Sequence, residues 1–245
     1  MAGAGAAPTG SSPVQFGVTA PALDARSSTL AWVAPFAVFM GWLALGPALA
    51  IPQPWESLAR VGALAVVLLT VSRDLVFALR VRHALPSVGL GLAVFLLWIA
   101  PDQMVPGWRS HWLFQNRLTG SVTTSIPPAT LADPLVAGLR VVRAALLVPI
   151  LEELFWRGWL PRWVARRDWA QIPLGTFTPL AFVATAVLFA VEHGPYWEVG
   201  LLCGLLYNAW MMRTRSLGDL VLTHAVTNGA LSAFVLVTGQ YGYWM

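Results

Sequence analysis

The stretch LAWVAPFAVFMGWLALGPALAI, Leu30–Ile51, decides the fold class of this chain. Its 22 residues include no ionisable side chain. At a rise of about 1.5 Å per residue, a helix of this length spans the roughly 30 Å hydrocarbon core of a bilayer. The segment lacks the basic start and short apolar core of a cleaved signal peptide, so we expect a retained first transmembrane helix.

Further apolar runs follow along the chain. The long ones are Ala84–Pro101, Trp169–Val191 and Leu220–Met245, with 18, 23 and 26 residues, the last interrupted only by His224. The weaker ones, which are short or carry charges, are Val61–Ser72, Val199–Met212 and Pro134–Leu160. The sequence therefore predicts an all-α fold, a polytopic membrane bundle of about seven transmembrane helices within a range of six to eight.

The composition agrees with a membrane protein and excludes other classes. Hydrophobic residues make up 57% of the chain and charged residues only 11%, whereas a soluble domain carries about 25% charged residues. The single Cys203 lies inside an apolar run, so no disulfide framework exists. All 15 basic residues are Arg and form short clusters between apolar runs. This distribution is typical of cytoplasmic membrane loops, and no nucleic-acid partner is expected.

The arginine clusters also predict a topology with a cytoplasmic N-terminus. The clusters that then fall on the inner side are Arg73/Arg80/Arg82, Arg157/Arg162/Arg166/Arg167 and Arg213/Arg215. Only Arg60, Arg109 and Arg117 are left clearly outside. Seven helices place the C-terminus outside as well.

We expect one membrane domain behind a short tail. Residues 1–29 are rich in Ala, Gly, Ser and Pro and are predicted to be disordered. Residues 30–245 form a single transmembrane domain without an internal repeat. The one long loop, Asp102–Asp133, contains several Trp and Arg residues and is interpreted as an interfacial segment.

The densest group of charges inside an apolar run is Pro149-Ile-Leu-Glu152-Glu153-Leu-Phe-Trp-Arg157-Gly158. A charge near the centre of a membrane helix costs about 2.5–3.5 kcal/mol, so such residues indicate function. Glu153 and Arg157 stand at i and i+4 and can pair, whereas Glu152 points about 100° away. A purely structural ion pair is the alternative, but it does not explain the second carboxylate. Charge geometry leaves open which glutamate is a base.

Two further motifs carry ionisable or amide groups. Phe189-Ala-Val-Glu192-His193 ends one apolar run, and His224-Ala-Val-Thr-Asn228 places an imidazole and an amide on one helical face. Together with the glutamates, these groups match the needs of acyl-bond hydrolysis, in which a base activates water and donors stabilise an oxyanion. Glu192 either tunes His193 or lies in water at the helix end, and the second interpretation is favoured.

The three motifs, in this order, resemble those of the CPBP intramembrane protease family. This family includes the type II CAAX prenyl endopeptidases and bacterial homologues once called Abi proteins. The resemblance covers about residues 140–240 and includes Phe155-Trp-Arg-Gly158 and Arg213-Thr-Arg-Ser-Leu217. The segments EELFWRG, EHG and HAVTN are also similar to those of CAAX-protease-related proteins associated with bacterial exosortase sorting systems.

The resemblance implies an intramembrane endopeptidase that cuts a membrane-associated or lipidated protein, expected in a bacterial inner (plasma) membrane. It implies that Glu152 is the general base that activates water, assisted by His193. His224 and Asn228 would then form the oxyanion hole. An exosortase-type sorting system is a partner suggested by the looser similarity.

The same resemblance implies that Glu153 and Arg157 orient the site. No cofactor is expected. Zinc is the less favoured alternative, with Glu152, His193 and His224 as its ligands, since no His-Glu-x-x-His helix is present.

Two other functions fit the same composition. One is a proton- or cation-coupled carrier, although carriers often show repeated halves, and the charges here concentrate in the second half. The other is a non-catalytic peptide-binding member of a sorting system. The sequence does not name a substrate, a cleavage position or an oligomeric state.

The predicted spans place the motifs at different depths. Glu152 lies near the inner end of its expected helix, His224 about 10 Å in and His193 about 24 Å in, at about 1.5 Å per residue. These residues meet only if helices are tilted, broken or shorter than the runs indicate. Pro149, Pro173, Pro179 and Pro195 are candidate break points.

Overall fold

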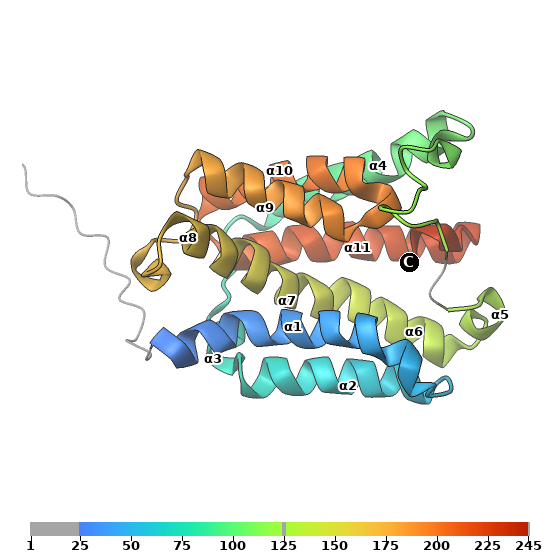
Figure 1. Ribbon diagram of the computed structural model, residues 1–245, viewed down its shortest axis with the longest axis horizontal. Coiled ribbons are helices and arrows are strands. Elements are labelled where there is room, and N and C mark those ends of the chain that lie inside the picture. The colour runs from blue at the N-terminus through green and yellow to red at the C-terminus, as the bar shows by residue number, and fades with distance from the viewer. Residues whose placement is uncertain (1–24, 124–125, 245) are drawn as a thin grey trace, which may run out of the picture.

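The structure is a computed structural model that describes residues 25–123 and 126–244. All regular elements in this part are helical, and the longer helices lie side by side along the long axis of the molecule (Figure 1). The first half contains α1 (Ala25–Leu49), α2 (Trp55–Thr70), α3 (Arg73–Ala78), α4 (Ala84–Met104), η1 (Trp108–Ser110) and α5 (Pro128–Leu131). Most of the predicted tail, residues 1–24, lies outside the described residues.

One long helix opens the second half of the chain and is built from five consecutive elements. They are α6 (Pro134–Val142), η2 (Arg143–Leu147), α7 (Val148–Glu153), η3 (Leu154–Trp159) and α8 (Leu160–Ala165). The remaining elements are η4 (Trp169–Gln171), α9 (Pro179–Glu192), η5 (Gly194–Tyr196), α10 (Trp197–Thr214), α11 (Leu217–Thr238) and η6 (Tyr241–Tyr243).

Within the described part of the chain, four helices are long and apolar enough to cross a membrane. They are Thr29–Leu49, Ala84–Met104, Pro134–Ala165 and Leu217–Thr238. This agrees with an integral membrane protein of several spans. Helices α2, α9 and α10 run alongside the four (Figure 1) but are shorter or less apolar. The total of about seven spans therefore stays a prediction.

Two helix boundaries differ from those predicted. The run Trp169–Val191 is not one helix, because a 3₁₀ turn at Trp169–Gln171 is followed by Pro173 and a left-handed Gly175, and α9 begins only at Pro179. A Cβ on Gly175 would lie 2.6 Å from the carbonyl oxygen of Met211, so this turn requires glycine. The predicted run Pro134–Leu160, in contrast, continues as a helix to Ala165.

The long helix departs from α geometry on both sides of Glu152, and two prolines explain where. Its π segments, η2 and η3, each end shortly before a proline, Pro149 and Pro161. Proline has no N–H to continue the α ladder, so an inserted residue is tolerated there. Glu152 is 13 residues from Ala165, about 20 Å of helix. The helix continues past Leu160, so Glu152 lies farther from its end than the predicted run indicates, and its depth in the membrane stays a prediction.

The ends of α11 follow from local sequence. The Ser216 side chain accepts a hydrogen bond from the Asp219 backbone N–H at 3.2 Å and caps the helix start. Gly239, with φ of 70°, ends the helix in a left-handed conformation. The apolar run Leu220–Met245 is therefore divided into α11 and the short η6.

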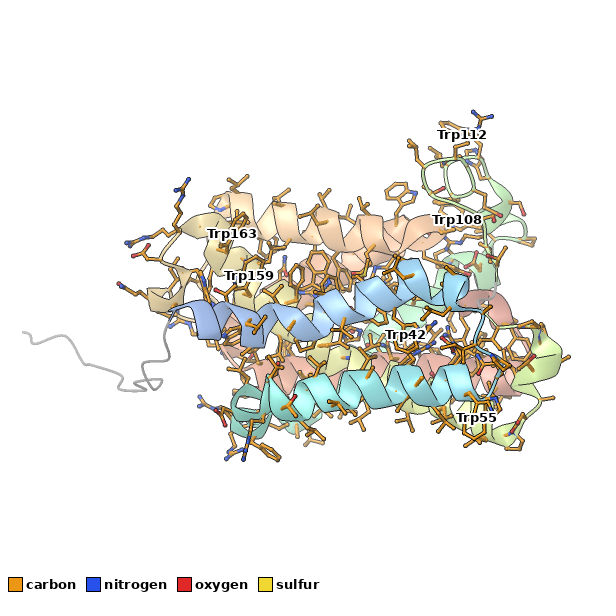
Figure 2. The ribbon with its side chains drawn as sticks, turned by 60° about the horizontal axis from the view of Figure 1, so that its bottom comes forward. Trp42, Trp55, Trp108, Trp112, Trp159 and Trp163 are labelled. Carbon is orange, nitrogen blue, oxygen red and sulfur yellow. The ribbon has the colours of Figure 1, made fainter. Side chains whose placement is uncertain are left out.

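Most of the arginines predicted to lie on the inner side gather at one end of the bundle, but Arg157 is buried within it. The start of α1, α3, the end of α8, the end of α10 and the start of α11 lie at one end, the Arg-rich end (Figure 1). The opposite end, the loop end, holds the α1–α2 and α4–α5 connections. Figure 2 shows Trp159 and Trp163 near the Arg-rich end, and Trp55, Trp108 and Trp112 near the loop end. Tryptophan at both ends is typical of the two membrane interfaces.

The long loop is fixed to the helices by Arg109 instead of lying freely at the interface. The Arg109 guanidinium pairs with Asp102 at 3.1 Å and with Glu198 at 2.7 Å, and it donates to the Pro195 carbonyl. Only 8% of Arg109 is exposed. The loop therefore packs on the turn between α9 and α10, the turn that also holds His193.

Close helix contacts depend on glycine. On α4, a Cβ at Gly91 would lie 2.5 Å from the Thr223 carbonyl oxygen and 2.8 Å from the Val226 Cβ of α11, whereas a Cβ at Gly89 meets nothing within 4 Å. We expect Gly91→Ala to lower the free energy of unfolding by about 1–3 kcal/mol through overpacking. Gly89→Ala is the matched control and should be neutral or slightly stabilising. Thermal unfolding in detergent measures both, and equal midpoints for the two variants would contradict this packing.

Candidate functional site

Glu153 lies at the centre of a buried polar network. Its Oε1 accepts hydrogen bonds from Arg157 Nη1 at 3.2 Å and from His224 Nδ1 at 2.8 Å. Glu153 is fully buried and Arg157 is 2% exposed. The predicted i, i+4 pair between Glu153 and Arg157 is confirmed, and the same carboxylate joins the long helix to α11.

Arg157 has a partner on α10 that sequence reasoning missed. Its Nε donates to Asn208 Oδ1 at 3.1 Å. Asn208 in turn donates to the Phe182 carbonyl at 2.9 Å and to Thr185 Oγ1 at 3.0 Å on α9. The signal was an amide inside an apolar run, which is costly in a membrane unless it is hydrogen-bonded.

Glu152 differs from Glu153 in its surroundings. It is 5% exposed and forms no hydrogen bond with a described residue, whereas Glu153 lacks a partner only at Oε2. The charged groups that act on it electrostatically are Glu192, Glu153 and Arg157, two carboxylates and one guanidinium. Neighbouring residues on a helix point about 100° apart, which explains why one glutamate is held while the other is not.

His193 stands just after the last residue of α9, and its tautomer follows from one contact. Nδ1 lies 2.6 Å from the Phe189 carbonyl oxygen, which can only accept, so Nδ1 donates. In the neutral ring, Nε2 is then the free acceptor. The ring packs against Trp98 and Phe189, with centroids 5.1 and 4.5 Å away. A Cβ on Gly200 would lie 3.2 Å from the His193 Cβ, so α10 supports the ring from behind.

The favoured interpretation of Glu192, a carboxylate in water at the helix end, is wrong. Its Oε2 accepts a hydrogen bond from Trp156 Nε1 at 3.0 Å, and Trp156 is buried. The reason is the π segment η3, which contains Trp156 and packs against α9. Glu192 therefore joins α9 to the long helix.

His224 and Asn228 both turn toward the long helix, as their spacing predicts. His224 binds Glu153, and Asn228 Nδ2 donates to the Ala144 carbonyl of η2 at 2.8 Å. The Tyr207 ring lies 5.3 Å from the His224 ring and donates its hydroxyl to a neighbouring threonine on α11. The imidazole and the amide thus lie along one side of the helix that carries the glutamates.

The alternative zinc site is not assembled in the described residues, where no group of three or more His, Cys, Asp or Glu side chains is placed to hold a metal. The Nδ1 atoms of His193 and His224 already contact Phe189 and Glu153. The expectation that the protein needs no cofactor stays a prediction.

A small, partly open pocket lies between α8, α9 and α10 and reaches the network from one side. Arg157, Phe182, Asn208 and Met212 are among its lining residues. Glu152 does not line it. The pocket therefore contacts the polar network at the Arg157 guanidinium and not at the Glu152 carboxylate.

Fold and site together define a multi-span helical membrane protein with a buried glutamate–histidine centre. Residues 134–230 match the family model described as type II CAAX prenyl endopeptidase Rce1-like, so the resemblance to the CPBP family is confirmed. The matched segment covers less than half of the chain and is similar to CAAX-protease-type intramembrane endopeptidases. It contains all six predicted site residues. No curated protein matches the chain, and no solved structure matches it.

The two glutamates should differ in their effect on stability. Glu153→Gln removes the charge that pairs with buried Arg157 and should lower the free energy of unfolding by about 3–5 kcal/mol. Glu152→Gln removes a carboxylate with an unpartnered buried oxygen and should be neutral or stabilising. Thermal unfolding of the two variants in the same detergent measures the difference. A larger loss for Glu152→Gln would contradict the network.

Proposed function

We propose that the chain hydrolyses a peptide bond in a membrane-associated or lipidated protein, with Glu152 as the base that activates water. The observation that carries this proposal is the contrast between the two neighbouring glutamates. Oε1 of Glu153 accepts hydrogen bonds from Arg157 and His224, and only its Oε2 is without a partner. Neither oxygen of Glu152 forms a hydrogen bond with the described residues, and its Oε2 is buried. A base must keep lone pairs for water, and Glu152 keeps those of both oxygens, whereas the two donors on Glu153 lower the basicity of that carboxylate.

His193 assists Glu152 in this proposal. Its Nδ1 donates to the Phe189 carbonyl, so Nε2 is free to accept a hydrogen bond from the same water. As the water oxygen forms a bond to the substrate carbonyl carbon, its proton passes to Glu152. Glu152 then delivers that proton to the leaving amine as the peptide bond breaks.

His224 and Asn228 act as donors to the developing oxyanion. Glu153 accepts from His224 Nδ1 and stabilises a protonated ring, whose Nε2–H is then directed to the substrate. Asn228 Nδ2 gives one hydrogen to Ala144 and keeps its second hydrogen for the oxyanion. Glu153 and Arg157 orient these groups without touching substrate.

The proposal predicts a loss of cleavage without a loss of protein. Glu152→Gln and His193→Ala should each reduce product formation by about 10²-fold or more, since each removes a proton-transfer group. Asp168→Asn, which alters an exposed carboxylate at the Arg-rich end, is the control and should cleave normally. Cleavage at the wild-type rate by membranes that carry Glu152→Gln would refute the role of Glu152.

To identify the substrate, membrane proteins are compared between cells that express the active chain and cells that express the Glu152→Gln variant. Mass spectrometry of protein termini should reveal a new terminus only with the active chain. Binding of a peptide without any product would favour a non-catalytic member of a sorting system. Proton or cation flux in reconstituted vesicles without substrate would favour a carrier. An exosortase-type partner and a bacterial inner membrane are proposals that rest on the sequence motifs alone.

Gly200 offers a test of how His193 is positioned. A Cβ at this position lies 3.2 Å from the His193 Cβ and should displace the ring by a few tenths of an ångström. We expect Gly200→Ala to lower kcat by about tenfold, because proton transfer depends on placement. The matched control is Gly204→Ala, which crowds Ala186 to a similar degree one turn away. Equal rates for the two variants would argue against this role.

A further inference from the structure

A second group of charges lies on another side of the long helix, away from the glutamates. It is the arginine cluster, defined by Glu56 and Arg60 of α2, Arg140 of α6 and Arg143 of η2. Arg140 and Arg143 are 8% and 6% exposed. The side chains of Arg60 and Glu56 are 11% and 13% exposed. Helix α2 packs against both α6 and η2, so these largely buried side chains lie where the two helices meet.

The single carboxylate of the cluster is already engaged. Glu56 pairs with Arg60 at 2.5 Å and accepts hydrogen bonds from Trp42 Nε1 at 2.9 Å and from Gln53 Nε2 at 3.0 Å. Its charge therefore neutralises Arg60, and its oxygens have little capacity for another donor.

Arg143 has one described carboxylate acting on its charge, that of Glu56, which is already paired with Arg60. No hydrogen bond or ion pair of the Arg143 guanidinium is formed with the residues 25–123 or 126–244. Arg60 Nε, on the facing helix, is also buried without a partner. A buried charge without a partner is destabilising by several kcal/mol. A bound anion would balance the charge of Arg143 and accept a hydrogen bond from Arg60 Nε.

We propose that the arginine cluster is a binding site for a phosphate group at the loop end of the bundle. Guanidinium groups from two helices converge there, and a phosphate offers more acceptor oxygens than a carboxylate does. Arg60 and Arg140 lie five and six residues after the starts of α2 and α6, about 8–9 Å of helix. Trp55, at the start of α2, is 64% exposed, as expected near lipid headgroups.

The cluster is distinct from the candidate catalytic site. Arg143 precedes Glu152 by nine residues, roughly 12 Å along the helix, and lies in η2, which packs against α2. Arg143 faces α2, whereas Glu152 is grouped with Glu192 of α9. The proposal does not depend on peptide hydrolysis and is tested without a substrate.

The test uses the full chain in nanodiscs of neutral phosphatidylcholine. One arm titrates inorganic phosphate, and the other replaces part of the lipid with phosphatidic acid. In at least one arm the unfolding midpoint should rise, on the order of 5 °C near saturation, because ligand binding stabilises the folded state. A rise with phosphatidic acid alone identifies a lipid headgroup as the source, and a rise with inorganic phosphate identifies a small anion. No rise in either arm would overturn the proposal.

Two variants assign the effect to the cluster. Arg143→Gln should abolish the rise without lowering the midpoint in phosphate-free discs, since it removes an unbalanced charge. Arg213→Gln, an exposed arginine at the other end, is the matched control and should respond like the wild type. Glu56→Gln removes the competing negative charge and should bind the probe about threefold or more tightly. An unchanged response in Arg143→Gln, or weaker binding in Glu56→Gln, would contradict a site at this position.

Discussion

The structure depends on the burial of one carboxylate, that of Glu153. An ion removed from water is tolerated only when its partners are well placed, and here a guanidinium and an imidazole both reach the same oxygen. Arg157 extends the network to Asn208 on α10, and His224 extends it to α11. A single charged group therefore fixes the relative positions of helices that lipid alone would not hold in register.

This constraint separates the tasks of two adjacent glutamates. Because Glu153 is committed to structure, the neighbouring Glu152 is free of partners while remaining in the same dry surroundings. Low solvent access strengthens every electrostatic interaction that a substrate would make there. Because Glu153 is fixed by hydrogen bonds, the neighbouring Glu152 carboxylate is left to react within an apolar bundle.

Much of this arrangement could be predicted from local spacing, and the rest could not. The i, i+4 rule gave the Glu153–Arg157 pair and the shared direction of His224 and Asn228, because both depend only on helix geometry. Contacts between distant segments, such as Arg157 with Asn208, have no periodic signature. The hydrogen bond between Trp156 and Glu192 was missed for the same reason. Helix ends were misplaced where proline and glycine interrupt an apolar run, as before α9.

The π segments on both sides of Glu152 have a consequence for how this helix tolerates changes in length. Removing one residue from η2 could be absorbed by a return to α geometry, which would leave the chain continuous. A deletion of one residue at the start of the regular α7 would instead turn the parts before and after it by about 100° relative to each other. A deletion that leaves hydropathy and length almost unchanged would thus separate the Asn228 contact at Ala144 from the glutamates. The two π segments, η2 and η3, each accommodate an extra residue and so preserve the rotational register of the long helix.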